Sequence, residues 1–174
     1  MNLQETLKFY GITSIWHFTD ESNLESIKKH GLLSLDLITQ QQIHVPCFGA
    51  DALSHSLDRN RGLDKFVHLS LIKEHPMQYV KTQDGLIPNP IWLEIDVSVL
   101  VENASQFSSD VANKNDVKPY NIELLSQGVD LEVLWGRTNW RDPIIKQRRS
   151  SAKKSELMVA NRIDYSKIKG VYHG

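Results

Sequence analysis

The sequence predicts a mixed α+β fold in a single domain that spans residues 1–174. Short segments in which apolar and polar residues alternate, as in strands, recur along the chain. Segments with the apolar spacing of helices lie between them. No internal repeat, low-complexity tract or shift of composition divides the chain, and 174 residues are enough for one hydrophobic core.

The composition limits the classes of function. A chain with 40% hydrophobic and 24% charged residues is an ordinary globular protein, and its net charge of −1 means that any attraction to nucleic acid must be local. Cys47 is the only cysteine, which excludes an intrachain disulfide and indicates a reducing compartment. No apolar run is long enough to span a bilayer, and residues 1–10 lack a signal-peptide pattern. We therefore expect a cytoplasmic protein without a membrane partner.

The first elements follow from residues 2–31. Residues 2–10 carry apolar side chains at helical intervals and stop at Gly11. Residues 14–20 are apolar and β-prone, so we expect a strand, followed by a helix that ends at Gly31. This order predicts that His17 lies at the end of a strand, just before a helix N-terminus. A polar or anionic ligand would meet free N–H groups there.

The middle of the chain reads mostly as scaffold. Alternation predicts strands over residues 66–71, 91–97 and 129–135, and helical spacing predicts a short helix over residues 117–126. In the second of these strands Trp92 is expected to point outward. The prolines Pro88 and Pro90 indicate an entering loop rather than the start of a central strand.

The strongest chemical signal lies near the end of the chain. Residues 156–160 read as a strand that begins with Glu156, and we expect a loop just before it. That segment is rich in serines and in the cations Arg148, Arg149, Lys153 and Lys154. A carboxylate in this place can orient a sugar hydroxyl or stabilise a developing cation, while the loop holds phosphates.

Motifs for several other chemistries are absent from the sequence. It contains no glycine-rich dinucleotide fingerprint, no Walker loop and no His-Glu-x-x-His, and the histidines His17, His68 and His75 show no spacing typical of metal ligands. We therefore expect no metal site.

Three segments follow one another in an order that is informative. The first is Ile15-Trp16-His17-Phe18-Thr19 with Ser22-Asn23-Leu24 and His30-Gly31-Leu32-Leu33. The second is an arginine before the strand at residues 66–71, followed by His75-Pro76-Met77. The third is Ser155-Glu156-Leu157-Met158-Val159. Together they resemble the DarT family, whose members are ADP-ribosyltransferase toxins that use NAD to modify bases in single-stranded DNA. A looser similarity covers residues 107–113, which we expect to form a polar loop near the cofactor.

The resemblance implies a split, mainly antiparallel β core with packed helices and NAD in the cleft. It maps the catalytic glutamate of the family onto Glu156 and the cofactor arginine onto Arg59 or Arg61. The sequence does not align the two arginines uniquely, although counting back from the strand favours Arg59. We also expect Arg59 to act in catalysis. The other expected NAD-binding residues are His17, Thr19 and Asn23. The cations Arg148, Arg149, Lys153 and Lys154 are expected to bind nucleic acid.

The resemblance implies a glycosyltransferase that transfers a pentosyl group, and we also expect classification as a nucleotidyltransferase. It would be the toxin of a toxin–antitoxin or phage-defence system, with a cognate antitoxin as a possible partner. Three alternatives remain open: transfer to RNA or protein, hydrolysis of NAD or removal of an RNA 2′-phosphate on the same fold, and a non-catalytic nucleic-acid-binding module. Trp135 and Trp140 would be the stacking surfaces of such a module.

Overall fold

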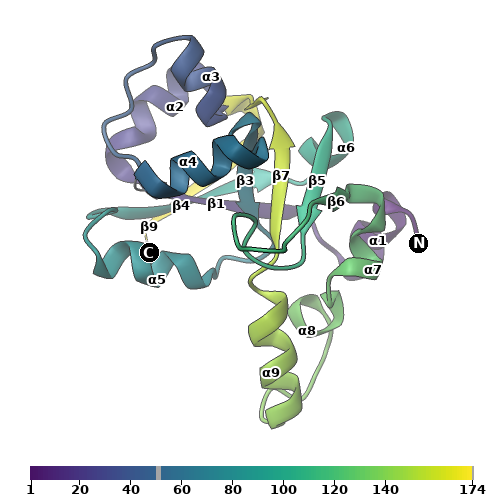
Figure 1. Ribbon diagram of the computed structural model, residues 1–174. Coiled ribbons are helices and arrows are strands. Elements are labelled where there is room, and N and C mark those ends of the chain that lie inside the picture. The colour runs from purple at the N-terminus through teal and green to yellow at the C-terminus, as the bar shows by residue number, and fades with distance from the viewer. Residues whose placement is uncertain (50–51, 174) are drawn as a thin grey trace.

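The computed structural model describes residues 1–49 and 52–173, and an antiparallel sheet lies at its centre (Figure 1). Seven strands form this sheet in the order β6-β5-β7-β3-β1-β4-β9, and β2 pairs with β8 in a second, two-stranded sheet. The strands are β1 (Ser14–Asp20), β2 (Leu32–Leu33), β3 (Phe66–Ser70), β4 (Pro90–Asp96), β5 (Ser105–Ser108), β6 (Tyr120–Asn121), β7 (Glu156–Ala160), β8 (Arg162–Ile163) and β9 (Ile168–His173). The predicted α+β class is confirmed.

Helices surround the sheet and project from it. They are α1 (Leu3–Tyr10), α2 (Leu24–His30), α3 (Leu35–Gln40), α4 (Ala52–Arg61), α5 (Pro76–Gln83), α6 (Val99–Glu102), α7 (Leu125–Gly128), α8 (Leu131–Trp135) and α9 (Pro143–Ala152), with 3-10 turns at Glu21–Asn23, Leu63–Lys65, Ile122–Leu124 and Tyr165–Lys167. In Figure 1, α2, α3 and α4 lie together on one side, whereas α8 and α9 extend below β7. In the described part of the chain, no helix has the length and apolar character needed to cross a membrane.

Local signals in the sequence explain the first elements. Asn2 and Glu5 form a reciprocal capping box at the start of α1, and Gly11 ends the helix with a left-handed φ of 64°. Asp20 ends β1 and accepts hydrogen bonds from the backbone N–H and the hydroxyl of Ser22. The predicted helix and strand are therefore present, and Asp20 caps the 3-10 turn that follows the strand.

The central strand β7 is covered on both faces. Leu157 and Val159 belong to the main hydrophobic core, while Met158 on the opposite face packs with Leu63 and Ala112. Leu157, Met158 and Val159 are fully buried. Glu156, the first residue of the strand, is consequently anchored on a strand that is buried on both faces.

The sheet splits between β1 and β3. These strands share a single registered pair, Trp16 with Ser70, whereas β1 and β4 are paired along all seven residues of β1. Across the opening, the His17 ring bonds to the backbone oxygen of His68 at 2.9 Å. A side chain thus satisfies a carbonyl that the sheet leaves unpaired.

The prediction of a strand over residues 129–135 was wrong, because most of this segment forms the helix α8. Leu131 and Leu134 are both buried and lie on one helical face, so the five-residue pattern fits a helix as well as a strand. Contacts with α9 stabilise the helix: Asp130 binds Arg148 at 2.7 Å, and the oxygen of Val133 accepts from Arg149 at 3.0 Å.

The expected loop before Glu156 was also wrong, since Arg148 and Arg149 lie on α9 and Lys153 ends it. The missed signal is Asp142-Pro143, in which the aspartate accepts from the N–H of Ile144 and the proline occupies the first turn. The prediction over residues 117–126 was partly wrong, because this segment contains β6 and a 3-10 turn before α7, with Asn121 capping the turn.

Three finer expectations also needed correction. His17 is the fourth residue of the seven in β1 rather than its last. Trp92 is 1% exposed and packs against Phe18 with ring centroids 5.3 Å apart, because this face of the sheet is covered too. Pro90 begins β4, which lies between β1 and β9; a proline is tolerated at the first residue of a strand.

Candidate active site

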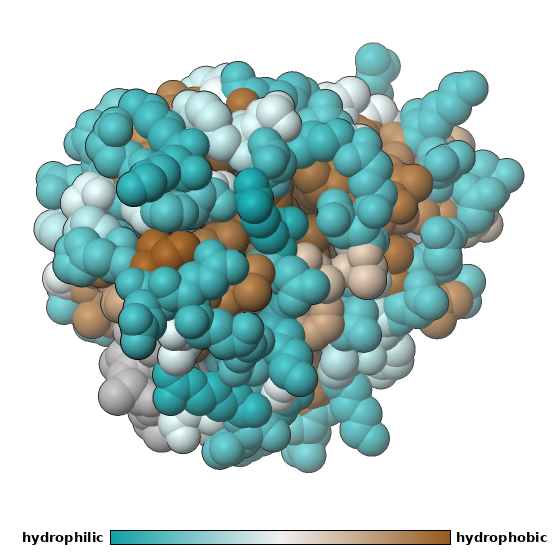
Figure 2. Space-filling model, turned by 90° about the horizontal axis from the view of Figure 1, so that it is seen from above, coloured by the Kyte–Doolittle hydropathy of each residue, from teal (hydrophilic) through white to brown (hydrophobic). Residues whose placement is uncertain are grey.

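Two adjoining cavities lie at the split between β1 and β3. The smaller has a volume of about 180 Å³ and is lined by Glu156 and His75, while the larger has about 260 Å³ and is lined by Thr19 and Asn23. The residues shared by both linings are His17, Phe18, Asp58, His68 and Lys81. The two cavities are therefore chambers of one cleft. Figure 2 shows one largely hydrophilic face of the molecule, with hydrophobic side chains visible in scattered areas.

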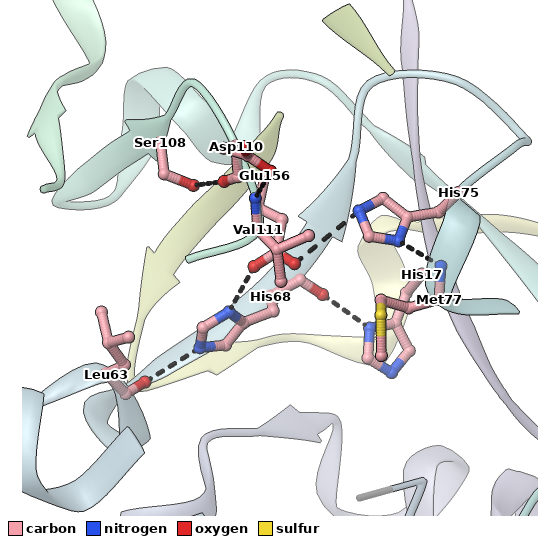
Figure 3. A network of polar contacts seen from close by, with 9 residues as sticks. All are labelled: His17, Leu63, His68, His75, Met77, Ser108, Asp110, Val111 and Glu156. Atoms are coloured by element: carbon pink, nitrogen blue, oxygen red, sulfur yellow. Dashed lines mark hydrogen bonds and ion pairs between the residues drawn. The ribbon is translucent and has the colours of Figure 1, made fainter. Parts of the chain in front are cut away.

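Glu156 lies between two histidines in the smaller chamber (Figure 3). Its Oε2 atom is 3.2 Å from His68 Nδ1, and its Oε1 atom is 3.7 Å from His75 Nε2. Burial opposes ionisation of this carboxyl, but the hydrogen bond and charge of His68 outweigh burial and hold the pKa of Glu156 below its usual value. Glu156 is therefore a carboxylate at neutral pH.

Both ring nitrogens of His68 face atoms that only accept hydrogen bonds. Nδ1 faces the Glu156 carboxylate at 3.2 Å, and Nε2 faces the backbone oxygen of Leu63 at 3.0 Å. Only the doubly protonated ring donates to both. Burial lowers the pKa of His68, but the hydrogen bond and charge of Glu156 outweigh it and raise the pKa overall. An imidazolium–carboxylate pair thus lies in the wall of the cleft.

His17 has the opposite character. Its Nδ1 atom must donate to the carbonyl of His68, so the neutral ring carries its proton there and its Nε2 lone pair is the acceptor. Burial is the main cause that lowers the pKa of His17 to about 4. At neutral pH this histidine offers the cleft an uncharged acceptor for a hydroxyl or amide donor.

His75 has a third protonation pattern. It is the N-cap of α5, and its Nδ1 atom accepts the backbone N–H of Met77 at 3.3 Å. The neutral ring therefore carries its proton on Nε2, directed toward Glu156 Oε1. Burial lowers the pKa of His75 and keeps the ring neutral.

Asn23 builds a wall of the larger chamber. Its amide nitrogen donates to Thr19 Oγ1 at 3.0 Å and to the Cys47 oxygen at 2.6 Å, and its amide oxygen accepts from the Cys47 N–H at 3.0 Å. Both donors of the buried amide are thereby used by the protein. Asn23 fixes the segment around Cys47 against β1 and shapes the chamber.

The structure does not bring either predicted arginine into the cleft. Arg59 is exposed on α4, and Arg61 binds the backbone oxygen of Lys114 and the side chain of Asn115. Neither lines a chamber. Of the lysines and arginines within residues 1–49 and 52–173, only Lys81 lines the cleft, and it lines both chambers.

The cations predicted to bind nucleic acid are mostly engaged with carboxylates. Arg148 binds Asp130 at 2.7 Å and Glu132 at 2.6 Å, while Arg149 and Lys153 bind Glu74 at 3.4 and 2.7 Å. These acids come from other parts of the chain, so the basic segment is locally neutralised. Lys154 is half-buried near the start of β7.

His68, His75 and Lys81 line the cleft but were not predicted from the sequence as site residues. The two histidines meet Glu156 because β3 pairs with β7, with Ser70 opposite Glu156, and because α5 begins next to this edge. A usable signal was His75-Pro76, since a capping residue before a proline marks a helix start. Across the described ranges, no three His, Cys, Asp or Glu side chains are grouped to bind a metal.

Comparisons with known proteins add a family and a fold. Residues 16–174 match the family described as "ssDNA thymidine ADP-ribosyltransferase, DarT". No curated protein matches the chain. The structure of Thermus sp. 2.9 DarT in complex with ADP-ribosylated ssDNA is similar, with a TM-score of 0.67 and 19% identity over 92% of this chain and 81% of that one.

Two further structures are similar to a comparable degree. Thermus sp. 2.9 DarT in complex with NAD+ has a TM-score of 0.60 and 19% identity over 92% of this chain and 81% of that one. Thermosipho africanus DarTG in complex with ADP-ribose has a TM-score of 0.66 and 19% identity, over 93% of this chain and 44% of that one. The predicted ADP-ribosyltransferase-like fold is confirmed.

Proposed function

The chain belongs to the DarT family of single-stranded DNA thymidine ADP-ribosyltransferases, and from that premise we propose how its own residues carry out the transfer. The protein is an NAD-dependent enzyme that transfers ADP-ribose to a base of single-stranded DNA, with NAD as the co-substrate. The proposal concerns the roles of the cleft residues, the identity of the base and the biological setting.

Glu156 is the proposed catalytic residue. Cleavage of the bond between nicotinamide and ribose produces an oxocarbenium-like transition state, which a nearby carboxylate stabilises. The supporting observation is that the described structure holds Glu156 ionised on β7 at the opening of the sheet, with Oε2 fixed by His68. The other oxygen, Oε1, is then left for substrate.

NAD occupies the larger chamber in this proposal. His17 Nε2 accepts a hydrogen bond from the nicotinamide–ribose end, and the wall formed by Thr19 and Asn23 orients it. A cation is needed for the pyrophosphate, because charge-assisted hydrogen bonds to phosphate are the strong ones. We assign this task to Lys81, since it lines both chambers, rather than to Arg59 or Arg61.

The acceptor is proposed to be thymine, as the name of the family indicates. The expected classification as a nucleotidyltransferase is not supported, because the family is described as an ADP-ribosyltransferase. We further propose that the protein acts as a cytoplasmic toxin with an antitoxin that removes ADP-ribose. The likeness to DarTG, of which this chain spans 44%, supports an antitoxin partner. The single cysteine Cys47 is consistent with the cytoplasm.

One experiment tests the proposed function against its alternatives. The protein is incubated with NAD labelled in the adenosine half and with separate pools of single-stranded DNA, RNA and protein. Label is expected in DNA that contains thymine and not in DNA without it. Label in RNA or protein alone, or loss of NAD without any labelled acceptor, would contradict the assignment of the acceptor.

A further inference from the structure

His75 has a polar atom that its surroundings leave unused. Its side chain is 9% exposed, and its Nε2 atom has no partner at hydrogen-bond distance among the residues that the structure describes. Burial lowers the pKa of His75, although the backbone of Lys154 lies near enough to the ring to offset part of this lowering. Glu156 Oε1, at 3.7 Å, is too far for a hydrogen bond. A buried donor without a partner costs free energy, so a ligand that supplies an acceptor at this place would be favoured.

The unused donor and a free acceptor lie side by side. His75 Nδ1 accepts from the Met77 N–H, so Nε2 carries a proton and can only donate. Glu156 Oε2 faces His68, which leaves Oε1 as the neighbouring acceptor. Both residues line the smaller chamber only, whereas Thr19 and Asn23 line the larger one only. The pair therefore lies apart from Thr19 and Asn23, while His17 and Lys81 line the smaller chamber as well as the larger one.

The smaller chamber also suits a planar ring. Phe18, Leu69, Met77 and Val111 line it. Aromatic and apolar side chains stack against an unpaired base, while hydrogen bonds read its pairing edge. The ligand edge that matches an acceptor beside a donor is a ring N–H beside a carbonyl. Thymine and guanine have such an edge, whereas cytosine and adenine have no ring N–H on theirs.

We propose that the smaller chamber binds the acceptor base, and that His75 Nε2–H and Glu156 Oε1 together select a base whose ring N–H adjoins a carbonyl. Glu156 Oε1 accepts the ring N–H, and His75 donates to the carbonyl. As the ring nitrogen bonds to the ribose carbon, the bond from that carbon to nicotinamide breaks and neutral nicotinamide leaves. The proton from the ring nitrogen passes to Glu156. This inference rests on the proposed function of Glu156, and it makes His75 a specificity-determining residue.

The test separates this role of His75 from its role in capping α5. Asparagine and serine are good N-caps, so His75→Asn and His75→Ser keep an acceptor for the Met77 N–H and remove the imidazole donor. Transfer from labelled NAD is measured on single-stranded oligonucleotides that carry one thymine, 2-thiothymine or 4-thiothymine. Sulfur is a weaker hydrogen-bond acceptor than oxygen. Melting temperatures of both variants confirm folding.

With wild-type protein, one of the two thio substitutions is expected to lower kcat/KM for transfer about tenfold, the scale of one hydrogen bond. Both variants are expected to lower transfer to thymine by about the same factor and to lose the thio effect. Comparing the thio effect of the wild-type protein with that of the variants removes the contribution of the intrinsic reactivity of the thio base, which is the same for all three proteins.

The outcomes distinguish the inference from the proposed function. An equal thio effect in wild type and in both variants overturns the role of His75. The same holds if the variants change inhibition by nicotinamide and KM for NAD instead, because the chamber would then hold nicotinamide. Wild-type protein that transfers to no oligonucleotide overturns the proposed function, and the inference with it.

Discussion

At the scale of single residues, three histidines of one cleft have three different protonation states at neutral pH. His68 is doubly protonated because both of its nitrogens face acceptors, His17 is neutral with its proton on Nδ1, and His75 is neutral with its proton on Nε2. Hydrogen-bond partners in the scaffold therefore decide which atom of each ring is available to a substrate.

The low pKa of His17 makes the stability of the protein depend on pH. The folded-state pKa is about 4 against an ordinary value of 6.5, so its contribution is fully present above pH 6.5 and is lost as the pH falls toward 4. Through this window the free energy of unfolding should fall by up to roughly 1.4 kcal/mol per pH unit because of His17.

Denaturant unfolding between pH 4 and 7 checks this expectation. His17→Gln, which cannot titrate, serves as the comparison and should show a correspondingly shallower slope. Parallel pH profiles for the two proteins would contradict the buried, neutral state of His17. The pKa of Glu156 does not confuse this comparison, because both proteins contain Glu156.

Variants of Lys81 and Arg59 test which cation binds the cofactor, because Lys81 is the proposed residue and Arg59 is the one predicted from the sequence. Replacing Lys81 with Met removes the charge that lines both chambers, and we expect NAD binding to weaken by about 1.5–3 kcal/mol, the scale of a hydrogen bond to a charged group. Arg59→Ala should have little effect, because Arg59 is exposed outside the chambers. Calorimetry that finds the reverse order would return the role to Arg59.

At the scale of elements, α9 separates structural cations from exposed ones. Arg148 and Arg149 contact acids and backbone of neighbouring elements, whereas Trp140 is 67% exposed just before α9, with the Arg141 guanidinium 5.2 Å from the centre of its ring. An exposed indole beside a cation can stack an unpaired base. Arg148 and Arg149 therefore stabilise the fold, whereas Trp140 with Arg141 is the better candidate for contact with DNA.

Two variants test this division. Trp140→Ala should weaken single-stranded DNA binding by about 1–3 kcal/mol and leave the melting temperature unchanged. Arg148→Glu should lower the melting temperature, because a third carboxylate would join Asp130 and Glu132. DNA affinity and thermal unfolding are measured for both. A stable Arg148→Glu protein that has lost its DNA affinity would favour the original prediction.

The sequence predicted the elements whose signals are local. Strand alternation located β7 and β3, Gly11 and Gly31 marked helix ends, and Glu156 was placed at the start of a strand. It misassigned α8, because five residues do not distinguish the two periodicities. It also missed His68 and His75, whose approach to Glu156 depends on strand pairing between residues about ninety positions apart, which a single sequence does not reveal.

At the scale of the whole molecule, the split sheet joins the parts of the site. The strand β7 anchors Glu156, β3 supplies His68, and β1 supplies His17 across the opening. Two chambers meet at this opening and share His17, His68 and Lys81, so a donor and an acceptor of ADP-ribose can be held next to each other. The assignment of residues 1–174 to a single domain stays a prediction.

The central claim is that the charge of Glu156 drives ADP-ribosyl transfer. Glu156→Gln keeps the size of the side chain and an oxygen that can accept from His68, but it removes the negative charge. We expect transfer from labelled NAD to thymine in single-stranded DNA to fall by about 10²-fold or more, while the protein stays folded and still binds NAD. Transfer by folded Glu156→Gln protein at close to the wild-type rate would contradict the account.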